Sequence, residues 1–187
     1  MPSISSIGGA DINLIYFDLE TQRSLEEVGG RANVRKLGMS VAVTYSTATN
    51  SFHRYTEKRV RALVDELRSA ELIVGFNVVE FDYEVLRGYG EFPFERLPTL
   101  DLMDHLAHRL GFRVSLDSVA TATLRVGKTS DGLQAIRWYR QGQLDKILSY
   151  CQQDVDITRR VHEYGQQFKM VYYWDKQYQR QMVAVNW

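Results

Sequence analysis

The sequence has only one cysteine, Cys151, among 187 residues, which excludes an internal disulfide and a cysteine-based zinc site. It has no run of about 18 apolar residues, the minimum for a membrane-spanning helix, and its start lacks the basic and apolar regions of a signal peptide. The 23 basic and 23 acidic side chains leave no net charge, which argues against indiscriminate coating of a polyanion but permits a local basic track. These absences predict a protein without a membrane partner in a reducing, cytoplasmic setting.

The composition is that of an ordinary globular chain, with 44% hydrophobic and 25% charged residues. Apolar periodicity predicts strands at 13–20, 38–45, 51–55, 71–76 and 99–101, and helices at 58–69, 79–87 and about 102–110, 116–124, 131–141 and 143–168. The first three strands indicate an antiparallel meander, and the later alternation of strands and helices indicates an α/β layer fold that ends in a helical region. We expect a single domain over 1–187, with its core at about 12–168 and a C-terminal hairpin or extended tail at 169–187.

Two carboxylates stand in the first predicted strand, which reads NLIYFDLE. Asp18 and Glu20 are two residues apart and therefore point to the same face, while Phe17 and Leu19 point to the other. Burying such ions costs several kcal/mol unless they are paired or bind a metal. The pair therefore indicates either a metal site or a strand end that emerges into solvent.

Two further segments carry acidic side chains next to apolar runs. In GFNVVEFD, Asn77 is expected to cap a helix, and Asp82 to lie in its first turn, where the helix dipole favours a carboxylate. In YCQQD, Tyr150 and Asp154 are i and i+4 on a helix and share a face. Each of these residues could have a purely structural role. Asp101 either supports a site or marks the end of a strand.

Taken together, Asp18, Glu20, Asp82 and Asp154 are four carboxylates from three separate segments. Clustered carboxylates repel one another unless cations neutralise them. Oxygen ligands select hard divalent ions such as Mg²⁺ or Mn²⁺, and a pair of these ions can activate water against a phosphodiester. The pattern therefore predicts a site for two divalent cations.

The segments FDLET, NVVEFD and YCQQD resemble the three motifs of the DEDD 3′→5′ exonucleases, whose patterns are DxE, Nx₃FD and YxxxD. The sister subclass carries His five residues before the last Asp, where this chain has Ser149, so the resemblance is to the tyrosine subclass, DEDDy. The resemblance covers about 12–168. Within the subclass, the chain looks most like the proofreading exonuclease domains of family B DNA polymerases, and it also resembles small stand-alone bacterial nucleases. The resemblance implies a ribonuclease H-like fold with a mixed central sheet flanked by helices.

The resemblance also implies roles for individual residues. Asp18, Glu20 and Asp154 would hold one Mg²⁺ or Mn²⁺, Asp18 with Asp82 would position a second, and Tyr150 would orient the attacking water. The implied activity is 3′→5′ hydrolysis of a single-stranded end, with DNA slightly favoured over RNA and a helicase or polymerase partner left open. Contacts to the strand are implied at Thr21, Asn77, Phe81, Ser115, Leu116 and Lys128.

Two other functions remain open at this point. The chain could be a catalytically quiet nucleic-acid-binding or docking module of a repair or helicase assembly, although its intact carboxylate set argues against this. It could also be a ribonuclease H-like endonuclease, although the YxxxD helix favours an exonuclease. The aromatic residues from Val171 to Trp187 could stack on bases, but we expect them to pack as a hairpin.

Overall fold

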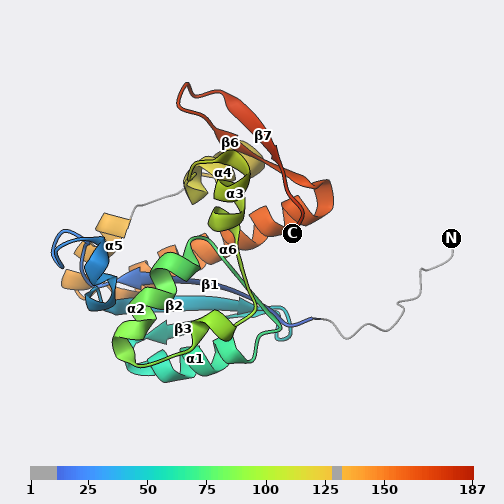
Figure 1. Cartoon of the computed structure of the whole chain (residues 1–187). Coiled ribbons are helices and arrows are strands. Elements are labelled where there is room, and N and C mark those ends of the chain that lie inside the picture. Colours follow the sequence, from blue (N-terminus) through green and yellow to red (C-terminus); the bar gives the residue numbers. More distant parts are fainter. Residues whose placement is uncertain (1–11, 128–131) are drawn as a thin grey trace.

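The computed structural model describes residues 12–127 and 132–187. A five-stranded mixed sheet lies at its centre, with the strand order β3-β2-β1-β4-β5 (Figure 1). β1 is antiparallel to β2 and parallel to β4, β2 is antiparallel to β3, and β4 is parallel to β5. The predicted fold class is therefore confirmed. The strands are β1 (Leu14–Thr21), β2 (Met39–Ser46), β3 (Ser51–Thr56), β4 (Leu72–Gly75) and β5 (Thr99–Asp101).

Helices cover the sheet, and most of the α-helices follow β5 in the sequence. The α-helices are α1 (Val60–Arg68), α2 (Tyr83–Leu86), α3 (Leu102–Leu110), α4 (Leu116–Leu124), α5 (Gly132–Arg140) and α6 (Leu144–Phe168). The short helices are η1 (Arg31–Lys36), η2 (Glu57–Arg59), the π-helical turn η3 (Val78–Asp82), η4 (Arg87–Tyr89) and η5 (Phe94–Arg96). Across 12–127 and 132–187, no helix has the combined length and apolar character needed to cross a bilayer.

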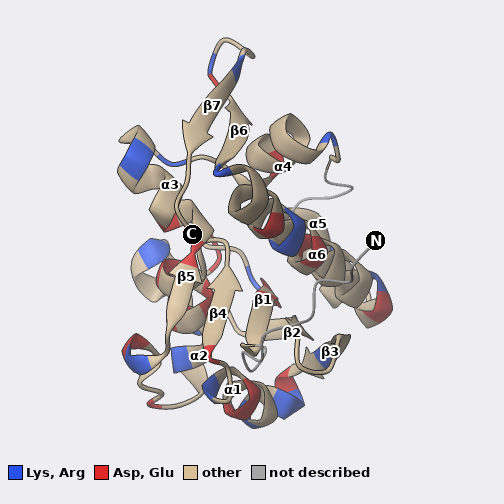
Figure 2. Cartoon of the chain, turned by 90° about the vertical axis from the view of Figure 1, so that its right-hand side faces the viewer, with Lys and Arg blue, Asp and Glu red and all other residues tan. Residues whose placement is uncertain are grey.

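A second, two-stranded sheet consists of β6 (Met170–Trp174) and β7 (Arg180–Ala184), which pair antiparallel as a hairpin. The hairpin extends from the body of the molecule beside α4, at the end opposite α1 (Figures 1 and 2). Thr123 of α4 joins the two, because its hydroxyl donates to the Tyr172 carbonyl and accepts from the Tyr172 N–H, each at 2.9 Å. The aromatic tail therefore packs as a hairpin.

The alternation of residues along β1 separates two hydrophobic cores. Ile15, Phe17 and Leu19 are buried in the core that also contains apolar residues of α1 and α2. Tyr16 points to the other face, into the core that contains Val155 of α6. Because Asp18 and Glu20 have the same parity as Tyr16, both carboxylates project toward α6, on the face opposite Phe17 and Leu19 as the sequence predicted.

The C-terminal part of α6 is covered by the last residue of the chain. The indole nitrogen of Trp187 donates to the His162 carbonyl at 3.0 Å, and a Cβ on Gly165 would lie 2.4 Å from that nitrogen. The His162 ring contacts the Tyr16 hydroxyl at 2.9 Å. A glycine at 165 is therefore what allows the indole to lie against the helix.

Burial makes His162 a source of acid sensitivity. Desolvation lowers the pKa of its imidazole to about 4, from an unfolded value of about 6.5. The unfolded chain therefore binds the proton more tightly than the folded chain does. The stability that the neutral imidazole contributes is intact above pH 6.5, and about 3 kcal/mol of it in total is lost as the pH falls to 4. Urea titrations between pH 7 and pH 4 should show a shallower fall for His162→Gln than for the wild type. Equal slopes would mean that His162 is not held neutral in the fold.

Candidate metal centre

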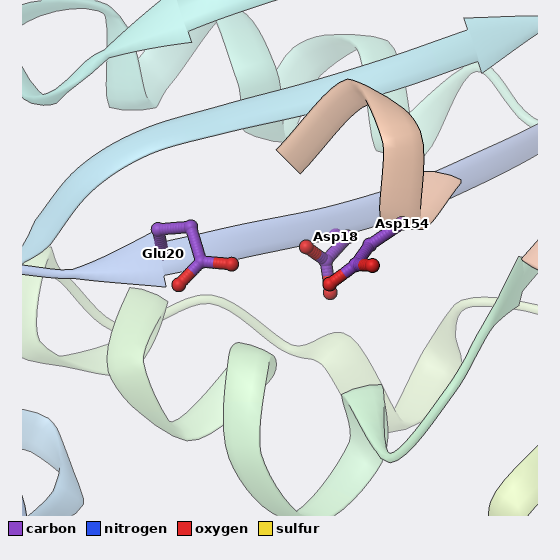
Figure 3. Close-up of side chains that lie close together, drawn as sticks. All are labelled: Asp18, Glu20 and Asp154. Carbon is purple, nitrogen blue, oxygen red and sulfur yellow. The ribbon is translucent and has the colours of Figure 1, made fainter. Parts of the chain in front are cut away.

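Three of the predicted carboxylates come together between β1 and α6. One oxygen each from Asp18, Glu20 and Asp154 can be chosen so that all three lie within 4.8 Å of one another. Asp18 and Glu20 extend from the same side of β1, and Asp154 reaches them from α6 (Figure 3). Glu20 and Asp154 are only 9% and 4% exposed, so much of the charge lies out of water.

Packing of α6 on the sheet places Asp154 in this group. Cys151 and Val155 are fully buried on the face of α6 that points to β1. The Cys151 thiol donates to the Asp18 carbonyl at 3.3 Å and to Asp18 Oδ2 at 3.4 Å. Burial, and then the charges of Asp18 and Glu20, raise the pKa of this thiol well above its usual range, which keeps it a donor.

Asp82 lies buried beside this group but is not one of the three closely spaced carboxylates. The pairing of β4 with β1 stops at Tyr16, so the Leu19 N–H lies beyond that ladder, and it donates to Asp82 Oδ1 at 3.0 Å. Burial, followed by the charge of Asp18, raises the pKa of Asp82 well above its usual range. Asp82 is thus close enough to interact strongly with the cluster.

The local structure around Asp82 differs from the expected one in two respects. Residues 79–87 do not form one regular α-helix: the π-helical turn η3 leads into the four-residue α2, and Asp82 is the last residue of that turn. The Asp82 carboxylate bonds to β1 instead of serving the first turn of its own helix. Asn77 does not cap the segment either, since its backbone is left-handed at φ 68° and its side chain makes no capping bond.

Asp101 performs the capping that was expected of Asn77. Its carboxylate accepts from the N–H groups of Asn77 at 2.7 Å and Val79 at 3.0 Å, at the entry to η3. It also caps α3 by accepting from Met103 at 3.1 Å and Asp104 at 3.3 Å. Asp101 therefore supports the segment that carries Asp82, and is more than the end of a strand.

Replacement of Asp101 by Ala should destabilise the fold by about 2–4 kcal/mol, because buried backbone donors lose their charged acceptor. The matched control is Asp104→Ala, which removes an exposed carboxylate in the first turn of α3 and should cost about 0.5 kcal/mol or less. Chemical unfolding of both variants provides the measurement. Similar losses for the two would show that the four hydrogen bonds do not stabilise this region.

The candidate contacts to nucleic acid fall into two places. Thr21 and Phe81 line a cavity of about 510 Å³ together with Glu20 of the carboxylate group. Leu133 and Ile136 of α5 form another part of its wall. No motif in the sequence indicated the contribution of α5, because α5 reaches β1 only through tertiary packing.

Asn77 and Ser115 are not among the residues that line this cavity, and Arg113, two residues before Ser115, bonds to Asn77. Arg113 donates to the Asn77 side-chain oxygen and to Glu80, each at 2.5 Å. Ser115 caps α4 by accepting from the Ser118 N–H at 3.1 Å. Leu116 is buried in the core, so its side chain packs inside the fold, and Lys128 lies outside the described residues.

Tyr150 stands one turn before Asp154 on the same face of α6, and both residues are buried. Its ring packs edge-on against Trp138 of α5, with 6.4 Å between ring centroids. Packing against α5 therefore fixes the position of the Tyr150 ring relative to the carboxylates.

The donor set fits hard divalent cations. Asp18, Glu20 and Asp154 offer only carboxylate oxygens, which Mg²⁺ and Mn²⁺ prefer as ligands. Burial first, and the negative charge of Asp18 second, raises the pKa values of Asp82 and Cys151. Cations bound by these three residues would relieve the repulsion.

Comparison with known proteins identifies the superfamily and the fold of the chain. The sequence profile of the RNase H superfamily matches residues 15–166. The fold is similar to that of the family B DNA polymerase from the hyperthermophilic archaeon Pyrobaculum calidifontis, with a TM-score of 0.65 and 14% identity over 88% of this chain. The match spans about 26% of that polymerase. A search of curated proteins returns no match. The fold and the resemblance indicated by the three motifs are thus confirmed, and the chain belongs to the RNase H superfamily.

Proposed function

We propose that the chain is one metal-dependent exonuclease domain that hydrolyses single-stranded nucleic acid from its 3′ end. The observation that carries the proposal is the carboxylate group of Asp18, Glu20 and Asp154, with Tyr150 one turn away from Asp154. This group matches the DxE and YxxxD motifs, and Asp82 of the Nx₃FD motif lies buried next to it. The match of all three motifs, on a fold shared with a family B DNA polymerase, supports 3′→5′ polarity.

Different residues of the chain have different roles in the proposed reaction. Asp18, Glu20 and Asp154 would hold one divalent cation, and Asp18 with Asp82 would position a second. The bound cations would lower the pKa of the attacking water and neutralise charge at the leaving oxygen. Tyr150 would orient the attacking water through its hydroxyl.

The cavity next to Glu20 suits a terminal nucleotide. Its volume of about 510 Å³ lies within the usual range of small-ligand sites, about 300–1,000 Å³. Phe81 offers a ring for the base, and the Thr21 hydroxyl, which donates to the Arg23 carbonyl at 2.9 Å, fixes the adjacent wall. Asn77 and Ser115 are proposed to contact the strand outside this cavity, with Leu116 shaping the start of α4 from the core.

Covalently closed circles test whether the enzyme requires a strand end. We expect a linear single strand to be degraded with Mn²⁺ present, and a circle of the same sequence to persist. DNA and RNA versions of both substrates determine the sugar preference, with DNA expected to be favoured slightly. Cleavage of the circle at the rate of the linear strand would show an endonuclease, and absence of any cleavage would favour a binding module.

A further inference from the structure

A second groove lies between the start of α4 and the C-terminal hairpin. It has a volume of about 580 Å³, and Phe112, Arg113 and Ser115 form one side of it. Trp174 and Lys176 form the other side, where β6 turns toward β7. None of the carboxylate group lines this groove, so it is separate from the metal centre.

Two aromatic side chains in the groove remain open to solvent although the surrounding packing positions them. Phe112 is 49% exposed and meets the buried ring of Tyr173 edge-on, with 5.9 Å between centroids. Trp174 is 39% exposed, and its indole N–H donates to Thr121 of α4 at 3.0 Å. Its backbone N–H donates to the Ser118 hydroxyl, also at 3.0 Å. Exposed rings held in place in this way suit the stacking of planar bases.

The groove also carries cationic side chains that could meet a phosphate. Arg113 and Lys176 line it together with one carboxylate, that of Asp175, and the tip of the hairpin carries both basic and acidic residues in Figure 2. The Asp175 carboxylate accepts from the N–H groups of Gln177 at 2.9 Å and Gln179 at 2.8 Å, which directs it into the turn. Arg113 is paired with Glu80, so Lys176 is the groove cation that we assign to a phosphate. The groove thus combines stacking surfaces with a cation for a phosphate, the two features of sites that bind single strands.

Arg113 connects this groove to the metal centre. It lines the groove and also donates to Asn77, the residue that precedes the η3 turn with Asp82. We infer that the groove binds the nucleotides on the 5′ side of the strand whose 3′ end lies at the carboxylates, an inference that rests on the proposed function. Bases stack on Phe112 and Trp174, and Lys176 pairs with a phosphate.

The test compares a long substrate with one too small to reach the groove. The value of kcat/KM is measured for a single strand of about 12 nucleotides, within the usual site size of such grooves. It is divided by kcat/KM for the p-nitrophenyl ester of thymidine 5′-monophosphate, which reports the metal centre alone. We expect Phe112→Ala to lower this ratio by about 5- to 100-fold, the usual cost of losing one stacked base.

Three further variants complete the test. Phe112→Trp should restore the ratio because it restores a stacking surface, and Phe168→Ala, which removes an exposed Phe outside the groove, should leave the ratio at the wild-type value. Lys176→Ala should reduce the salt dependence of strand binding by about 0.7 in log–log slope. If Phe112→Ala has the wild-type ratio of the two kcat/KM values, the groove does not bind the strand, and the proposed function is unaffected.

Failure of the proposed function gives a different result. In that case the wild-type protein hydrolyses neither substrate, and the groove is tested by fluorescence anisotropy of the labelled strand. Weaker binding by Phe112→Ala than by Phe168→Ala would then support the groove as a strand-binding site. Equal binding by the two variants would overturn the inference, and would leave the groove to another occupant such as a protein partner.

Discussion

Asp18→Asn is expected to lower turnover by about 10³-fold or more, because a cation ligand at the reacting phosphate contributes several kcal/mol. The Asp18 carboxylate belongs to the three-member group, and its charge raises the pKa of Asp82 more than the charge of Glu20 does. Single-turnover cleavage of a labelled single strand, with Mn²⁺ titrated over a wide range, provides the measurement. Wild-type turnover in this variant would show that Asp18 is not part of the metal centre.

The same substitution should leave the metal-free protein as stable as the wild type or more stable. Removing one negative charge relieves the repulsion among the acidic groups, and the Cys151 thiol keeps its bond to the Asp18 carbonyl. Thermal unfolding in EDTA tests this, with Asp65→Asn on the exposed side of α1 as the control for loss of a surface charge. A large drop in Tm for Asp18→Asn alone would make Asp18 a structural residue.

Tyr150→Phe should reduce turnover by about 10²–10⁴-fold, the usual scale for a positioned acid–base group. The substitution keeps the ring and its edge-on packing against Trp138, so the fold should be nearly unchanged. Affinity for Mn²⁺ should also be nearly unchanged, because the hydroxyl is proposed to act on the water and not as a ligand. Single-turnover rates, measured together with a metal titration, separate the two effects.

Asp154→Asn is the comparison for Tyr150→Phe, since Asp154 lies one turn further along α6 and belongs to the carboxylate group. It should reduce turnover more and should weaken metal binding as well. The double variant should be hardly worse than Asp154→Asn alone, because both residues act on one water. A wild-type rate in Tyr150→Phe would leave Tyr150 as a packed aromatic with no part in the reaction.

The sheet and the positions of the carboxylates could be predicted because they depend on local patterns. Alternation along β1 fixed which face Asp18 and Glu20 share, and the helical period of α6 placed Tyr150 and Asp154 on one side. The confirmed fold class follows from the order of strands and helices in the sequence. Predicting these features requires only the side-chain period of each strand or helix and the positions of its apolar residues.

The remaining parts of the site depend on contacts between residues that are distant in sequence. Asn77 has the residue type of a helix cap, but its own N–H group donates to Asp101, 24 residues later, and its backbone is left-handed. Cys151 reaches Asp18 across 133 residues, and α5 joins the cavity only through packing. Arg113 stands two residues before Ser115, and this position was the only signal that could have indicated it.

Metal-dependent shortening of a single strand from its 3′ end is the most direct test of the account. A 5′-labelled oligonucleotide is incubated with the wild-type protein in EDTA and then with Mg²⁺ or Mn²⁺ restored, and the products are resolved by length. We predict no cleavage in EDTA and, with metal, a ladder that shortens one nucleotide at a time with release of nucleoside 5′-monophosphates. Full activity after exhaustive chelation, or immediate release of the 5′-labelled nucleotide, would contradict the account.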